Sequence, residues 1–242
     1  MIDERAGLIY LLNVFYANPQ EFPRIGEDDE NITMMKRIIE LNPQLNENER
    51  NLLSCLYKTI VTKRRDVLRR FDSEFNPECQ QFEKRYEKMQ EFRETLVSEV
   101  DKYCLDLCQL IEDSLLPVTS TPEARIFYEK MEADYYRYMA ENHEGDERQD
   151  AIQKAGQHYE NALSISKSEI SSVSSLALGL VLNYSVFLYD MMEKHHEAIE
   201  LSEKSVQETI DLLDTLSDKS YTEASKIIML LKDNCQNWRE RL

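Results

Sequence analysis

Hydrophobic residues recur along the chain at intervals of three and four positions, with charged residues between them. This spacing is typical of helices that pack on one face, and no stretch shows the sustained alternation of a β-strand. Breaks containing Pro, Gly, Asn, His or Ser interrupt the pattern at eight places. The pattern therefore predicts an all-α protein with nine helices, at residues 3–17, 28–41, 47–74, 80–115, 122–142, 147–167, 174–191, 196–214 and 221–240.

Three of the predicted helices have recognisable start signals: Asn46 with Glu49, Thr121 with Pro122, and Ser220 with Glu223. In the first and third pairs, a side chain that can cap the helix precedes a Glu by three residues, which is the spacing of a capping box. In the second pair, Pro occupies the first helical position, where its missing N–H costs nothing.

The connections between the predicted helices are short, which makes neighbouring helices antiparallel. Successive pairs of 35–50 residues have the rhythm of a helical repeat, but no consensus sequence is repeated. Composition does not separate two domains. We therefore expect one all-helical domain over residues 1–242, built as a layered antiparallel bundle.

Charge narrows the range of partners. The chain has 242 residues with 29 Lys and Arg against 46 Asp and Glu, a formal net charge of −17. Such a protein repels nucleic-acid phosphates and anionic membrane surfaces, so we expect neither as a partner. The most apolar run, Leu176 to Tyr189, is too short to span a bilayer. No apolar segment led by Lys or Arg opens the chain, so a cytoplasmic protein is expected.

The five cysteines are scattered and odd in number: Cys55, Cys79, Cys104, Cys108 and Cys235. Two that lie four residues apart, Cys104 and Cys108, share a face of a predicted helix. This arrangement favours buried, reduced thiols over disulfides or a metal site, and a reducing compartment.

The sequence lacks the common catalytic motifs. It contains no phosphate-binding glycine loop, no His-Glu-x-x-His and no Gly-x-Ser-x-Gly. Glu193-x-x-His196 matches the spacing used in di-iron bundles, but such sites need two of these motifs and two further carboxylates. A solvated helix junction is the better interpretation of this pair. We therefore expect neither an enzyme nor a cofactor, and a di-metal bundle enzyme is the least favoured function.

One segment departs from the acidic character of the chain. Residues 58–70 carry six basic side chains against a single Asp. Lys58 and Arg65 are seven residues apart, so they project from one face of their helix.

A second predicted helix repeats this spacing with Lys130 and Arg137, and Asp134 lies between them where it can pair with both. Tyr138 offers a hydroxyl beside Arg137. If the two helices converge, these cations form a site for a dianion such as phosphate. The alternative is an ordinary solvated surface with weak ion pairs.

Two later helices carry apolar lines interrupted by an amide: Leu182, Val186 and Asp190 with Asn183, and Ile227, Leu230 and Trp238 with Asn234. Taken singly, the apolar members are typical of a core. The amide of Asn carries both a donor and an acceptor, which suits binding to the backbone of an extended peptide.

Most of these residues lie in stretches with a specific order and spacing. The stretches are Asn48-Glu-Arg-Asn-Leu-Leu-Ser54, Tyr57-Lys58 with Arg64-Arg65, Asp134-Tyr-Tyr-Arg-Tyr-Met-Ala-Glu141, Leu178-Gly-Leu-Val-Leu-Asn-Tyr-Ser-Val-Phe187, Leu213-Asp-Thr-Leu216 with Ser220-Tyr221, and Leu230-Leu-Lys-Asp-Asn234 with Trp238. From about residue 45 to 240 the chain resembles the 14-3-3 family of phosphoserine/phosphothreonine-binding adaptors.

The resemblance implies a concave amphipathic groove and a role for each residue singled out above. It assigns the phosphate to Lys58, Arg65, Arg137 and Tyr138. It places Lys130, Asp134, Leu182, Asn183, Val186, Asp190, Ile227, Leu230, Asn234 and Trp238 along the peptide groove. Asn183 and Asn234 are then expected to hold the ligand main chain. Asp190 stands where the family usually has the longer Glu.

The resemblance also implies homo- or heterodimerisation through the first 44 residues, where the sequence match is weakest. Glu27 stands where the family tends to have Arg, Thr95 where it tends to have Lys, and Val67 where some members have a phosphorylated Ser. The chain ends four residues after Trp238, without the family's acidic tail. The expected function is a phosphopeptide-binding adaptor in signalling, and the alternative is a helical-repeat scaffold that binds peptides independently of phosphate.

Overall fold

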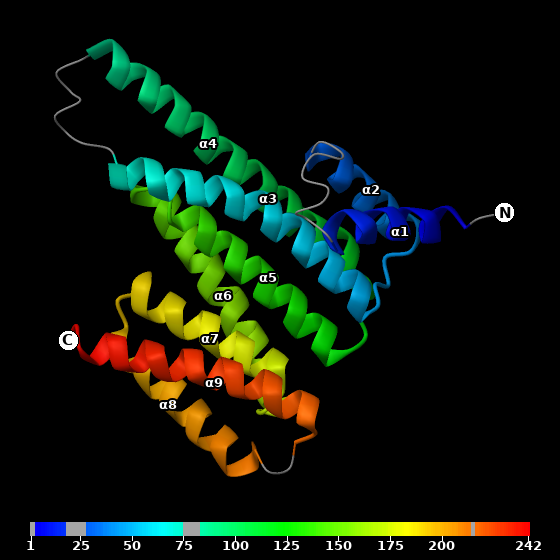
Figure 1. Cartoon of the computed structure of the whole chain (residues 1–242), viewed down its shortest axis with the longest axis vertical. Coiled ribbons are helices and arrows are strands. Elements are labelled where there is room, and N and C mark those ends of the chain that lie inside the picture. The colour runs from blue at the N-terminus through cyan, green and yellow to red at the C-terminus, as the bar shows by residue number, and fades with distance from the viewer. Residues whose placement is uncertain (1–2, 18–27, 75–82, 214–215) are drawn as a thin grey trace. The chain divides into compact units, whose positions relative to one another are not determined.

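The hydrophobic stripes form α-helices throughout the part of the chain that the computed structural model describes, residues 3–17, 28–74, 83–213 and 216–242. No strand occurs within these ranges, so the all-α prediction is confirmed there. The α-helices are α1 (Glu4–Ala17), α2 (Asp28–Leu41), α3 (Glu47–Glu74), α4 (Glu83–Leu110), α5 (Pro122–Ala140), α6 (Gly145–Glu169), α7 (Ser175–Asp190), α8 (His195–Leu212) and α9 (Asp218–Arg239) (Figure 1).

Two of the predicted start signals act as expected. At the start of α3, the Glu49 N–H donates to Asn46 Oδ1 at 3.1 Å, and the Asn46 N–H donates to Glu49 Oε2 at 3.0 Å. At the start of α5, Thr121 Oγ1 accepts from the Ala124 N–H at 3.3 Å. These bonds satisfy N–H groups that have no partner within the helix.

The predicted start of α9 at Ser220 is wrong. The helix begins at Asp218, and Ser217 caps it by accepting a hydrogen bond from the Ser220 N–H at 3.4 Å. The expected partner, Glu223, instead accepts a hydrogen bond from Ser175 Oγ at 2.7 Å. Ser217, three residues before Ser220, provides an equivalent cap. The carboxylate of Glu223 is bound by Ser175 of α7 and not by the backbone at the start of α9.

The helix predicted over residues 80–115 is α-helical only as far as Leu110. After α4 comes a π-helical turn, η2 (Ile111–Leu115), followed by a 3₁₀ turn, η3 (Leu116–Val118). Pro117 explains the change, because it has no N–H and its ring obstructs the preceding turn of an α-helix.

The chain divides into two compact units, Met1–Thr119 and Ser120–Leu242. In the first unit, α3 packs against α1, α2 and α4. Its core includes Met35 and Ile38 of α2, Leu53 and Leu56 of α3, and Leu107 of α4, all fully buried. The single domain over residues 1–242 stays a prediction.

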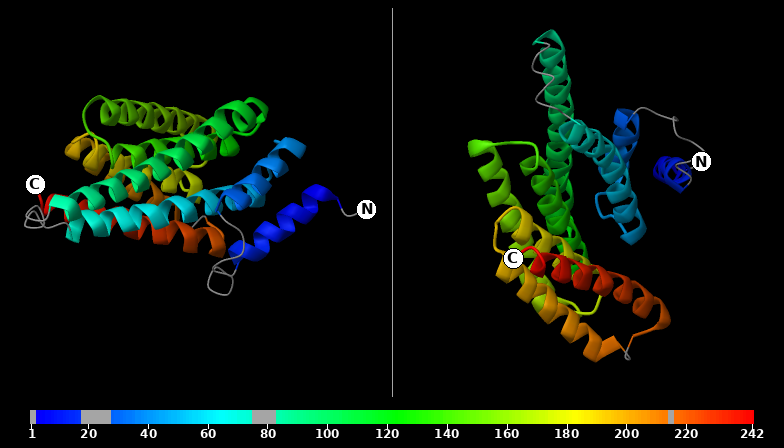
Figure 2. Two further views of the ribbon diagram at one scale, coloured as in Figure 1. Left: turned by 90° about the horizontal axis from the view of Figure 1, so that it is seen from above. Right: turned by 60° about the vertical axis from the view of Figure 1, so that its left-hand side comes forward.

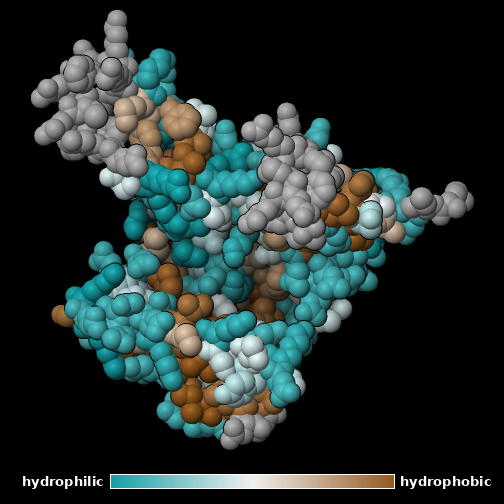
Figure 3. Space-filling model, viewed as in Figure 1, coloured by the Kyte–Doolittle hydropathy of each residue, from teal (hydrophilic) through white to brown (hydrophobic). Residues whose placement is uncertain are grey.

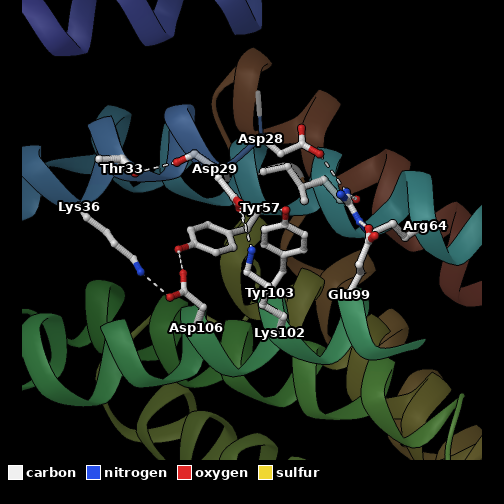
Figure 4. A network of polar contacts seen from close by, with 11 residues as sticks. Asp28, Asp29, Thr33, Lys36, Tyr57, Arg64, Glu99, Lys102, Tyr103 and Asp106 are labelled. Atoms are coloured by element: carbon white, nitrogen blue, oxygen red, sulfur yellow. Dashed lines mark hydrogen bonds and ion pairs between the residues drawn. The ribbon is translucent and has the colours of Figure 1, made fainter. Parts of the chain in front are cut away.

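A polar network joins α2 to α3 and α4 within the first unit (Figure 4). Arg64 donates from Nη1 to Asp28 at 2.9 Å and from Nε to Glu99 at 2.6 Å. The Tyr57 hydroxyl donates to Asp106 at 2.6 Å. The remaining labelled members are Asp29, Thr33, Lys36, Lys102 and Tyr103. The network gives Arg64 a structural role in holding three helices together.

In the second unit, α5 packs on α6, and α7 packs on α5, α6, α8 and α9. Helices α8 and α9 lie side by side and run in opposite directions (Figure 2). The core that α8 and α9 share with α7 contains Val181, Val206, Ile228 and Leu231. None of the helices within the described ranges has both the length and the apolar character needed to cross a membrane.

The predicted burial of the thiols holds for three of them. Cys104, Cys108 and Cys235 are buried and are not in disulfides. Cys55 is exposed, because it lies on the outward side of α3, so the prediction was wrong for this residue. Cys79 lies outside the described residues.

Candidate functional site

Helix α5 brings together the acidic and basic side chains that the sequence singled out in the second unit. Lys130 Nζ lies 2.8 Å from Asp134 Oδ2, one turn away along the helix. Arg137 Nη2 lies 3.4 Å from Asp134 Oδ1, in the next turn. Asp134 therefore pairs with both cations, as the four- and three-residue spacing indicated.

Asp134 is the centre of a larger buried cluster. Its side chain is 9% exposed, and its carboxylate also accepts hydrogen bonds from the Tyr159 hydroxyl and from Asn183 Nδ2, the latter at 2.8 Å to each oxygen. Burial alone would raise the pKa of Asp134, but Lys130, Arg137 and Tyr159 stabilise the carboxylate and lower the pKa to about 2. The group is an anion at neutral pH.

Arg137 is held in one orientation by several contacts. Its side chain is 12% exposed, and its Nε donates to the Tyr159 hydroxyl at 3.3 Å. Its Nη1 lies 3.6 Å from Glu141 Oε1, and its guanidinium lies 4.8 Å from the centre of the Tyr138 ring. Burial disfavours the charge, but the neighbouring Tyr159 and Asp134 raise the pKa of Arg137 above its ordinary value. Arg137 therefore remains a cation despite its burial.

The predicted groove residues of α7 and α9 have different exposures. Leu182 and Ile227 are partly buried and pack against the core of this unit. Leu230 is 51% exposed, and Trp238 is buried, stacked on Tyr189 at 4.6 Å between ring centres. Figure 3 shows hydrophobic surface gathered beside α9, bordered by hydrophilic surface.

The other predicted groove residues lie on the same two helices. Asn183, Val186 and Asn234 are partly buried, and Asp190 is exposed at the end of α7. Asn183 is the member with a defined polar role, because its amide binds Asp134 across two helices. The hydrogen bonds within the described ranges do not connect Asn234 to this cluster.

The first unit carries the remaining two cations on α3. Lys58 is exposed, whereas Arg65 is 7% exposed. Two helical turns separate them, about 10 Å along the axis, so they share one face of α3. The adjacent Arg64 points into the polar network of Figure 4, which separates the roles of the two consecutive arginines.

Sequence reasoning missed Tyr159. It belongs to a buried stripe of α6 with Ala155 and Ala162, so it has the pattern of a core aromatic residue. The available signal was its hydroxyl, since a fully buried Tyr usually finds a hydrogen-bond partner. Burial, reinforced by the charge of Asp134, raises the pKa of Tyr159 well above its ordinary value, so the hydroxyl stays protonated.

Four other predictions concern residues away from the Asp134 cluster. Glu193 and His196 are both exposed at the junction before and within α8, as a solvated helix junction requires. Val67 is 43% exposed on α3, and Thr95 bonds back to the Glu91 carbonyl of its own helix at 2.8 Å. Glu27 lies outside the described residues.

Comparison with known proteins identifies the family. A sequence model of the family "14-3-3 protein" matches residues 22–239. The chain is 37% identical over 210 residues to 14-3-3 protein beta/alpha-A of Xenopus laevis, covering 87% of this chain and 86% of that protein. It is 36% identical over 210 residues to 14-3-3-like protein 2 of Caenorhabditis elegans, covering 87% of this chain and 84% of the relative.

A third relative, 14-3-3 protein beta/alpha of Bos taurus, is 36% identical over 210 residues, covering 87% of this chain and 85% of that protein. The chain belongs to the 14-3-3 family. Membership supports the general role of a phosphopeptide-binding adaptor, in a family of non-catalytic proteins.

Proposed function

We propose that this protein binds phosphorylated Ser/Thr segments of client proteins and discriminates them from the unmodified segments. Lys58 and Arg65 of α3 and Arg137 and Tyr138 of α5 take the phosphate, and Lys130 lines the same groove. The proposal requires the two units to present these residues to one ligand.

The Asp134-centred cluster is the observation that carries this proposal. It holds Lys130 at 2.8 Å and Arg137 at 3.4 Å, so both cations are oriented before any ligand arrives. A pre-oriented guanidinium loses little conformational entropy when it forms bidentate hydrogen bonds to phosphate oxygens. An ordinary solvated surface would leave such side chains free to move.

Discrimination follows from charge. A phosphate brings about −1.5 to −2 charges at neutral pH, whereas a hydroxyl brings none. An unphosphorylated peptide therefore brings no negative charge to offset the free-energy cost of keeping these cations partly desolvated. The acidic remainder of the protein, which has a net charge of −17, favours clients with basic residues beside the phosphosite.

The peptide chain itself is bound by the amides and the apolar side chains of α7 and α9. Asn183 donates both of its described hydrogen bonds to Asp134, so its amide oxygen is the group that accepts a ligand N–H. Asn234 is the second amide. Leu182, Val186, Ile227 and Leu230 form the apolar wall, with Asp190 and Trp238 at one end.

Fluorescence anisotropy tests phosphate dependence directly. We expect a labelled Arg-Ser-x-phosphoSer-x-Pro peptide to bind with micromolar or tighter affinity, and its unphosphorylated twin not to bind. Equal binding of the two peptides would instead establish a phosphate-independent helical scaffold. Binding of neither peptide would contradict the proposal.

A charge reversal tests the site in the second unit. Arg137→Glu removes the guanidinium and places a carboxylate beside the phosphate, so we expect at least about a 100-fold loss of phosphopeptide affinity. Arg125→Glu is the matched control, because Arg125 is exposed on the same helix, about 120° around the axis. Wild-type affinity in Arg137→Glu, with the helical circular dichroism signal retained, would remove this site assignment.

A double-mutant cycle tests whether the two units contact one phosphate. Arg65→Gln and Arg137→Gln are measured singly and together against the same phosphopeptide. Residues that bind one group couple by about 1 kcal/mol or more, whereas independent sites add. A parallel cycle with the exposed Arg69→Gln should be additive. Additive effects of Arg65 and Arg137 would show that the units do not share the ligand.

The remaining properties follow from the same assignment. The protein acts without catalysis, in the cytoplasm, where the free thiols Cys55, Cys104, Cys108 and Cys235 stay reduced. It pairs with itself or with a related chain through the first unit. Two grooves in one dimer would give avidity for doubly phosphorylated clients.

A further inference from the structure

Tyr159 is fixed in the interior of the second unit by its ring. Its side chain is fully buried in α6. The ring stacks on Tyr184 of α7, with 5.3 Å between ring centres, and lies 5.2 Å from Phe187 of the same helix. Because neighbours on α7 confine the ring, the position of its hydroxyl is determined by the core.

The hydroxyl joins the two charged groups of the candidate site. It donates its single proton to Asp134 Oδ1 and accepts the Nε–H of Arg137 at 3.3 Å. A neutral phenol can do both at once, because it has one donor and two acceptor lone pairs. Tyr159 therefore links the carboxylate to the guanidinium that it neutralises.

These bonds also determine which edge of the Arg137 guanidinium is engaged by Tyr159 and Asp134. Nε points to Tyr159, and Nη2 points to Asp134 at 3.4 Å, so this edge of the guanidinium is turned towards the protein. Nη1, which lies 3.6 Å from Glu141, belongs to the other edge. The N–H groups of that edge are the ones that can reach phosphate oxygens.

We propose that Tyr159 is a positioning residue, which orients Arg137 through its Nε so that the Nη1 edge is presented to the phosphate of the ligand. The inference rests on the proposed function for its consequence in binding, but its geometric part concerns Arg137 alone. Without the hydroxyl, the buried Nε–H loses its acceptor and Asp134 loses a donor. The guanidinium then rotates so that its Nε–H finds another hydrogen-bond acceptor, and its Nη1 edge is no longer oriented for the ligand.

The test compares Tyr159→Phe with Tyr184→Phe. Each change removes one hydroxyl from the same aromatic stack, but Tyr184 makes none of the described hydrogen bonds to Asp134 or Arg137. We expect Tyr159→Phe to lower phosphopeptide affinity about tenfold, as loss of a hydrogen bond to a charged group does. Tyr184→Phe should bind as the wild type does.

A second readout follows Arg137 without any ligand. In the free wild-type protein, the Nε–H resonance of Arg137 in ¹⁵N NMR spectra should exchange slowly with water, since it is buried and hydrogen-bonded. In Tyr159→Phe this resonance should shift and exchange faster, while in Tyr184→Phe it should not. A general loosening of the core would move both variants alike.

The outcomes separate this inference from the proposed function. Wild-type affinity in Tyr159→Phe overturns the inference, whether or not the Nε–H resonance moves. If the wild type itself binds no phosphopeptide, the proposed function fails, and the Nε–H resonance alone decides whether Tyr159 orients Arg137. If Tyr159→Phe does not fold, the wild-type resonance decides, because fast exchange there would overturn the inference.

Discussion

At the scale of single residues, Asp134 shows how a buried charge is accommodated. Its carboxylate has four partners on three helices: Lys130 and Arg137 on its own helix, Tyr159 on α6 and Asn183 on α7. Such a group stabilises the fold only while it is ionised, because its partners are cations and hydrogen-bond donors. The same bonds that stabilise the protein also orient the candidate site.

Asp134 should make folding stability depend on pH. Its pKa is about 2 in the folded protein against an ordinary value of 3.8, so its contribution is present above about pH 4 and is lost as the pH falls towards 2. The shift corresponds to about 2 kcal/mol in total, of which about 1 kcal/mol is lost by pH 3. Urea unfolding of wild type and Asp134→Asn at pH 6, 4 and 3 measures this loss.

The expected signature is a difference in stability between the two proteins that shrinks as the pH falls. Asp150→Asn is the control, since Asp150 is 64% exposed and pairs with Lys154 on the helix surface. Its pH dependence should follow that of the wild type. A constant difference between wild type and Asp134→Asn from pH 6 to pH 3 would contradict the assignment of this charge.

At the scale of elements, α1 is attached to α3 by a bidentate ion pair. Arg5 Nη1 and Nη2 donate to the two oxygens of Glu49 at 2.8 and 2.9 Å, and the same carboxylate caps the start of α3. The side chains are 19% and 7% exposed. Burial alone would raise the pKa of Glu49, but the bonds from Arg5 and Asn46 lower it.

Glu49→Gln changes the shape of the side chain little, but it should lower the free energy of unfolding considerably. It removes the charge that Arg5 requires and leaves the guanidinium partly buried, so we expect a loss of about 2 kcal/mol in the free energy of unfolding. Glu91→Gln makes the same substitution in an exposed pair with Lys88 and should cost less than about 0.5 kcal/mol. Chemical denaturation of both variants at neutral pH compares them, and equal losses would show that the Arg5 contact does not secure α1.

At the scale of the whole molecule, the first unit carries exposed apolar side chains, among them residues of α1, α3 and α4. Tyr10 is 69% and Leu11 44% exposed on α1, Val67 is 43% exposed on α3, and Phe92 is 51% exposed on α4. Helix α1 lies within the first 44 residues, to which the family resemblance assigns dimerisation, and α3 and α4 carry Val67 and Thr95, two positions singled out for the same interface. Because Thr95 stands where the family resemblance leads us to expect a Lys, we expect apolar contacts to contribute more than ion pairs to the dimer.

Phe92→Asp tests this expectation. We expect sedimentation velocity at micromolar concentration to show a dimer for the wild type and a shift towards monomer for the variant, since a charge is placed on a surface that becomes buried. Met229→Asp is the control, because Met229 is 65% exposed on α9 of the second unit. Raising the salt concentration should change the wild-type dimer little. Equal effects of the two substitutions would contradict an interface on the first unit.

The sequence determined the features that depend on neighbours along the chain. The helices, the caps at Asn46 and Thr121, and the pairing of Asp134 with Lys130 and Arg137 all follow from periodicity and from three- and four-residue spacing. The family could also be recognised, because its motifs occur in order along the chain.

The contacts between helices could not be inferred from spacing along the chain and were seen only in the folded protein. Tyr159 and Asn183 bind Asp134 although they lie 25 and 49 residues away in the sequence. Two consecutive arginines that look equivalent in the sequence also differ in their contacts, because Arg64 pairs with Asp28 of α2 and Glu99 of α4, whereas those ion pairs do not include Arg65. The partner of Glu223 was also found only in the structure, where its carboxylate accepts a hydrogen bond from Ser175 of α7. The physical reason is that helix geometry relates residues one turn apart, whereas packing decides which distant side chain completes a buried charge.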